Sequence, residues 1–93
     1  MGANRQRLAT DWLSKARFAA ALSPGEPWPA WSTGEVLAVA LILGDTDELA
    51  AMGYTREEAL NRLRYDLGLP SVAVAGAVFD QMSAQLAGPD GVG

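Results

Sequence analysis

Two pairs of acidic residues come closest to the spacing that acid–base or metal chemistry requires. Asp45 stands two positions before Asp47, and Glu57 adjoins Glu58. Both pairs lie where a helix is expected to begin, and acidic side chains at such positions stabilise the helix dipole and bond free backbone N–H groups. Helix capping therefore explains these carboxylates without catalysis.

The residues that would complete a catalytic or metal site are missing. The sequence has no cysteine and no histidine, which removes the thiolate nucleophile, the commonest general base and the commonest zinc ligands. Gly34, Gly44 and Gly53 are isolated and do not form a phosphate-binding loop. We therefore expect a protein that is not an enzyme and that holds no cofactor or metal.

A group of basic and amide side chains could contact DNA. A short helix over Thr46–Met52, a turn, and a helix over Arg56–Leu67 would form a helix-turn-helix. The candidate contacts are Arg56, Asn61, Arg62 and Arg64. Glu57 and Glu58 precede most of them and would repel phosphate, and the chain has a net charge of −4. DNA binding is thus the alternative hypothesis, and we expect nucleic acid not to be the partner.

Aromatic residues in the segment 23–31 are the strongest candidates for binding. Three prolines and a glycine predict an extended loop here. Trp28 and Trp31 could fold back and cover the core, because a tryptophan buries a large area. The alternative is that they are anchors for a partner, since tryptophan is enriched at binding hot spots. The sequence leaves both interpretations open.

An apolar run is expected to form the centre of the fold. Ser32 and Glu35 have the spacing of a capping box, and the helix that they begin should end at Gly44. The residues of Val36–Leu43 are apolar on every side, which is typical of a helix buried all round. A buried strand is the alternative, because short apolar runs are ambiguous.

Further caps and glycine stops predict three short helices in the second half. The caps are Asp45, Thr55 and Ser71, and the stops are Gly53, Gly68 and Gly88. The last helix, from Val72 to about Ala87, carries an apolar seam, although alternation over residues 72–79 also allows a strand. Gly76 within it is expected to let another backbone approach closely.

The first helix is predicted from about Leu8 to Leu22, after a flexible polar arm over residues 1–6. Residues 88–93 are expected to be a flexible tail. With 49% hydrophobic residues the chain can bury a core. The sequence therefore predicts one all-α domain over residues 1–93, a compact bundle of about five short helices around the central helix 36–43.

Several residues between 45 and 79 carry a family likeness. They are Met52-Gly53-Tyr54 at the first turn, Ala59-Leu60 and Leu63-Arg64 in the next helix, Pro70 in the second turn and Ala73-Val74 beyond it. This segment resembles the ubiquitin-associated (UBA) three-helix domain. The resemblance implies a UBA-like arrangement within residues 45–87 and an apolar ubiquitin-binding patch of Met52, Gly53, Tyr54, Ala77 and Val78. Arg62, which stands where the family has a small residue, departs from the pattern.

Residues 12–15 and 22–29, with the richness in alanine and glycine, carry a second likeness. In these features the chain resembles the small accessory proteins of actinobacterial phages. The resemblance implies a protein–protein interaction module that binds a host or phage protein or associates with itself. We expect it to be cytoplasmic, because no signal peptide is visible and the apolar run of eight residues is shorter than the roughly 20 of a membrane span.

Overall fold

The computed structural model describes the backbone of residues 2–92 and the side chains of residues 5–87. Within this part of the chain the backbone forms five α-helices and no strand. They are α1 (Gly2–Ala20), α2 (Thr33–Leu43), α3 (Thr46–Ala51), α4 (Arg56–Leu67) and α5 (Val72–Val92). The predicted all-α class is confirmed, and the strand alternatives for 36–43 and 72–79 are wrong.

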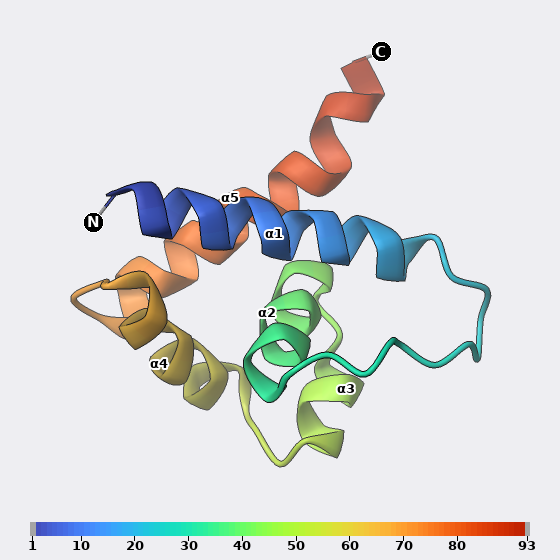
Figure 1. Ribbon diagram of the computed structural model, residues 1–93, viewed down its shortest axis with the longest axis horizontal. Coiled ribbons are helices and arrows are strands. Elements are labelled where there is room, and N and C mark those ends of the chain that lie inside the picture. The colour runs from blue at the N-terminus through green and yellow to red at the C-terminus, as the bar shows by residue number, and fades with distance from the viewer. Residues whose placement is uncertain (1, 93) are drawn as a thin grey trace.

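Helix α2 lies at the centre, as predicted. Each of the other four helices packs against it, with α1 crossing over it and α3 and α4 on either side (Figure 1). All residues from Leu37 to Ile42 are buried, while Val36 and Leu43 at its ends are half-buried. This arrangement explains the apolar sequence of residues 37–42, because no side of that part of α2 faces water.

The predicted caps position the helix ends. Ser32 and Glu35 form a reciprocal capping box at the start of α2, and Thr55 and Glu58 form another at the start of α4. Asp45 accepts a hydrogen bond from the Glu48 amide 3.0 Å away, at the start of α3. Glycine stops follow α2 and α4, where Gly44 and Gly68 adopt left-handed φ angles of 69° and 67°. These short-range signals are confirmed.

The core joins helices that are distant in the sequence. Phe79 of α5 is fully buried and its ring stacks on Trp12 of α1, with centroids 5.8 Å apart. The inward face of α4 adds a further group of buried residues, namely Ala59, Leu60, Leu63 and Leu67. Two polar contacts tie the helix ends together: Arg5 Nε donates to the Leu67 carbonyl at 2.9 Å, and Ser83 Oγ donates to the Ile42 carbonyl at 2.7 Å.

The first and last helices are longer than predicted. The segment 2–6 is helical rather than an arm, because it contains good helix formers and Arg5 is held by the end of α4. Helix α5 continues to Val92, so the tail predicted over 88–93 is helical up to that residue. Gly88 does not stop it, since the helix runs through this residue. Met1 and Gly93 lie outside the described residues.

Gly76 does not mark a close backbone approach, contrary to the prediction. A Cβ atom at this position would meet the Leu60 Cδ1 atom of α4 at 3.7 Å, which is an ordinary van der Waals distance. The neighbouring helix thus contacts Gly76 through a side chain, and room remains for a methyl group.

No helix in the described part of the chain is both long enough and apolar enough to cross a membrane.

Candidate functional site

Three aromatic side chains form a continuous row where the end of α1 meets the loop before α2. Phe18 packs edge-on against Trp31 with ring centroids 6.2 Å apart, and Trp31 lies 6.0 Å from Trp28 in a tilted arrangement. We call Phe18, Trp31 and Trp28 the aromatic row. Phe18 is 52% exposed, whereas both tryptophans are half-buried and pack against the core. The tryptophans therefore cover part of the core and leave part of their own area accessible. Their role as binding anchors stays a prediction.

Local contacts fix the loop that presents the tryptophans. The loop turns at Gly25, whose φ of 88° is a left-handed value that glycine adopts without strain. The Ser23 amide donates to Glu26 Oε1 at 2.7 Å, which closes the turn through the side chain. The Trp31 amide donates to the Pro29 carbonyl at 2.7 Å just before α2 begins. The row is thus held by a constrained loop and a helix.

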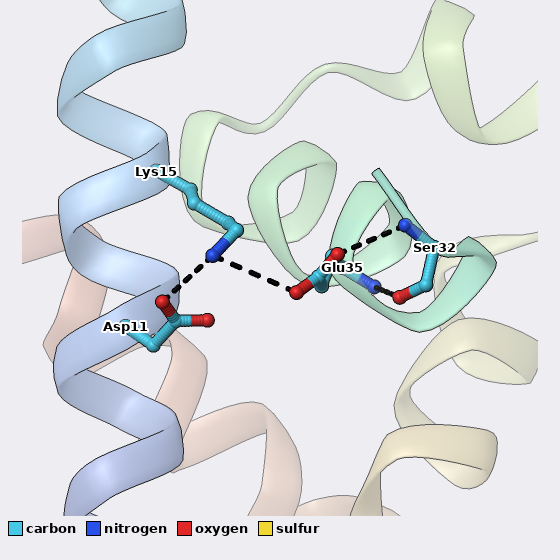
Figure 2. Close-up of polar contacts among 4 residues, drawn as sticks. All are labelled: Asp11, Lys15, Ser32 and Glu35. Carbon is cyan, nitrogen blue, oxygen red and sulfur yellow. Dashed lines mark hydrogen bonds and ion pairs between the residues drawn. The ribbon is translucent and has the colours of Figure 1, made fainter. Parts of the chain in front are cut away.

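A polar network fastens α1 to the start of α2 beside the row (Figure 2). Lys15 Nζ lies 2.7 Å from Asp11 Oδ1 and 3.6 Å from Glu35 Oε2. Glu35 also accepts a hydrogen bond from the Ser32 amide at 2.9 Å. The hydrogen bond to Asp11 raises the pKa of Lys15, and the bond from the Ser32 amide, with help from Lys15, lowers the pKa of Glu35. Both groups are therefore held in their charged forms.

A shallow hollow accompanies this network. Its lining consists of Ser14, Lys15, Phe18, Pro29 and Trp31. The lining places two aromatic rings and a proline ring beside the polar ends of Ser14 and Lys15. What this arrangement offers chemically is contact area.

The sequence identified Trp28 and Trp31 but missed Phe18. Phe18 lies off the apolar face that Trp12 and Ala16 form on α1. An aromatic residue on the polar side of an amphipathic helix, next to a Trp-Pro loop, was the available signal. Its partner could not be foreseen, because the contact with Trp31 depends on how the loop returns over the helix.

The residues of the predicted ubiquitin-binding patch are distributed over two elements. Met52 and Tyr54 are half-buried against the core in the turn between α3 and α4, and Gly53 is exposed there. Exposed Ala77 and half-buried Val78 line a hollow formed by α5 residues alone. Within the described residues α3 packs on α2 and α4 but not on α5. The UBA-like arrangement stays a prediction.

The arginines of the DNA-binding alternative are engaged within the protein. Arg56 pairs with Asp80 of α5 at 3.1 Å, and Arg62 donates to the Tyr54 hydroxyl at 2.8 Å. Arg64 donates to Asn61 at 2.8 Å and stacks over the ring of Tyr65. Arginines that already hold the α4 surface together have fewer donors for phosphate, so this geometry gives the DNA alternative less support than the aromatic row gives protein binding.

Comparison with known proteins adds nothing to the resemblance to UBA domains or to the resemblance to phage accessory proteins. The search finds no protein-family model that matches the chain, no similar curated protein and no similar solved structure.

Proposed function

We propose that this protein is a non-catalytic protein–protein interaction module that binds its partner through the aromatic row. The observation that carries the proposal is the row itself: three large aromatic side chains in consecutive contact, with Phe18 more than half exposed. The resemblance of the sequence to small accessory proteins of actinobacterial phages supports a host or phage protein, or a second copy, as the partner.

The geometry suits a binding hot spot for two physical reasons. Tryptophan is among the residues that carry most of the energy at protein interfaces, because its large ring loses contact with water on binding. The half-buried tryptophans are also held by the core and the loop, so little conformational entropy remains to be lost when a partner docks. The row is therefore prepared for binding before a partner arrives.

Affinity capture from an actinobacterial lysate with matched variants tests this proposal. Phe18→Ser removes the exposed end of the row, and Tyr65→Ser removes an aromatic side chain that is 67% exposed on α4. Because both rings are exposed, both variants are expected to fold, which circular dichroism checks. We expect Phe18→Ser to abolish capture of a partner and Tyr65→Ser to retain it. Equal capture by both variants would contradict the proposal.

A further inference from the structure

The two tryptophans of the aromatic row carry hydrogen-bond donors that the fold does not use. Among the side chains of residues 5–87, neither the Trp28 nor the Trp31 indole N–H donates a hydrogen bond within the protein. No buried side-chain nitrogen or oxygen in this range lacks a partner, so both unpaired N–H groups reach the solvent. Each tryptophan thus offers an apolar ring and a free donor at the same surface.

The hollow beside the row limits the kind of ligand that fits. It is lined by Phe18 and Trp31 and by the hydroxyl-bearing, exposed Ser14. Its volume of about 260 Å³ is below the roughly 300–1,000 Å³ that is usual for small-molecule pockets. Lys15, in the same lining, has its charge balanced by two carboxylates of the chain. This surface therefore favours a neutral segment with free hydrogen-bond acceptors over an anion or an enclosed small molecule.

Most recurring modes of peptide binding need features that this surface does not offer. Addition of a strand needs a sheet edge, and the backbone of residues 2–92 contains no strand. A docked amphipathic helix needs a groove several turns long, whereas the hollow is small. Phosphopeptide recognition needs clustered arginines, and the lining of the hollow contains none. The mode that remains is recognition of a polyproline II (PPII) helix by aromatic side chains.

The spacing of the rings matches such a helix. The Phe18 and Trp31 centroids are 6.2 Å apart, and those of Trp31 and Trp28 are 6.0 Å apart. A PPII helix rises about 3.1 Å per residue, so two residues span about 6 Å. With three residues per turn, residues i and i+2 lie on one face of the helix and can contact successive rings of the row. Its carbonyl groups have no internal hydrogen bonds and can accept from the indole N–H groups.

We propose that the aromatic row binds a proline-rich segment of the partner protein in the PPII conformation. This inference rests on the proposed function and specifies the chemistry of the partner. Proline rings pack on the aromatic rings, and the two indole N–H groups donate to backbone carbonyls of the segment. Both surfaces are ordered before they meet, since PPII is stiff and the tryptophans are held by the core, which reduces the entropy lost on binding.

NMR titration with a decaproline peptide tests the inference on the intact chain. The three tryptophans give three indole N–H signals, which Trp28→Phe and Trp31→Phe assign. We expect the signals of Trp28 and Trp31 to shift saturably, with a Kd below about 1 mM. The signal of Trp12, which is 3% exposed in the core, should stay in place as an internal control. A decapeptide of alternating glycine and serine, which is flexible and lacks proline rings, should cause no shift.

Two matched variants locate the binding surface. Phe18→Ser should weaken decaproline binding at least about tenfold, because it removes the exposed ring of the row. Tyr65→Ser removes a ring that is 67% exposed on α4 and should leave the Kd unchanged. Circular dichroism of both variants checks that they remain folded.

The outcomes separate this inference from the proposed function. Decaproline that shifts neither Trp28 nor Trp31, or that shifts Trp12 equally, overturns PPII recognition, as does binding that Phe18→Ser does not weaken. Phe18-dependent capture of a protein from the lysate would still support the interaction function in each of these cases. Failure of both the titration and the capture overturns both. Decaproline binding that depends on Phe18 but not on Tyr65 supports both.

Discussion

Phe79 links α5 to α1, two helices that pack on α2 and come from opposite ends of the sequence. Its side chain has no exposed area and stacks on Trp12 of α1. A buried ring in such a position contributes both its transfer from water and its packing contacts, and its removal leaves a cavity that the neighbours fill only partly. The stability of the domain should therefore depend strongly on this one side chain.

We predict that Phe79→Ala lowers the free energy of unfolding by about 3–5 kcal/mol. That is a large part of the roughly 5–15 kcal/mol available to a native domain. Urea unfolding followed by circular dichroism measures the change. Val74→Ala is the control on the same helix, because Val74 is 38% exposed and should lose about 0.5 kcal/mol. Equal losses in the two variants would show that the Phe79–Trp12 contact does not hold the core.

Two glycines should respond oppositely to the same substitution. Gly76→Ala should raise the free energy of unfolding by up to about 1 kcal/mol, since Gly76 is helical and an added Cβ meets Leu60 at 3.7 Å. Gly44→Ala should lower it by about 1–2 kcal/mol, because its φ of 69° disfavours any side chain. Thermal unfolding of both variants gives the two signs. Destabilisation by Gly76→Ala would mean that α4 and α5 pack more closely than described.

At the scale of elements, the start of α2 carries both a cap and a charge cluster. Glu35 accepts from the Ser32 amide and lies 3.6 Å from Lys15 of α1. The amide hydrogen bond, followed by the effect of Lys15, lowers the pKa of Glu35 below its ordinary value of 4.5. A lowered folded-state pKa contributes stability that is complete above the unfolded-state pKa and disappears as pH falls through the folded-state value.

We predict that Glu35→Gln changes how the free energy of unfolding depends on pH in acidic solution. Glutamine retains the capping hydrogen bond but has no charge. The stability advantage of the wild type over the variant should be constant above about pH 4.5 and should shrink as pH falls further. Lys15 does not interfere, because its pKa is raised and its contribution is lost only in alkaline solution. Urea midpoints measured between about pH 2 and pH 7 test this, and an advantage that stays constant to the lowest pH would contradict it.

Elements with short-range signals could be predicted from the sequence, and those fixed by distant contacts could not. Ser32, Thr55 and Gly44 act on their own helix, so the boundaries of α2 and α4 follow from neighbours within a few residues. The start of α1 depends on Arg5 reaching the carbonyl of Leu67, far along the chain. The same reasoning applies to the candidate site, where both tryptophans could be identified but Phe18 joins them only through the path of the loop.

At the scale of the whole molecule, the fold is a flat body of about 36 × 35 × 20 Å built around one enclosed helix. Among the described residues, helix α2 contacts all four other helices, whereas α3 contacts α2 and α4 alone. The end of α5 extends beyond the other helices (Figure 1). The protein therefore has a central helix that every other helix covers, and peripheral segments that few helices contact.

This arrangement predicts a gradient of hydrogen exchange. Amides in α2 can open only when all the covering helices separate, so their exchange should report global unfolding. Amides of α3 and of α5 beyond Met82, the last buried residue of that helix in the described range, should exchange through local opening and therefore faster. Exchange followed by mass spectrometry of peptides resolves these segments. Helix α2 holds the molecule together through burial rather than polar contacts. Phe79→Ala should therefore accelerate amide exchange in α2 by the factor that corresponds to its full loss of folding stability. Amide exchange in α3 should stay nearly unchanged, because it proceeds by local opening. Exchange in α2 as fast as in α3 in the wild type would contradict a core centred on α2.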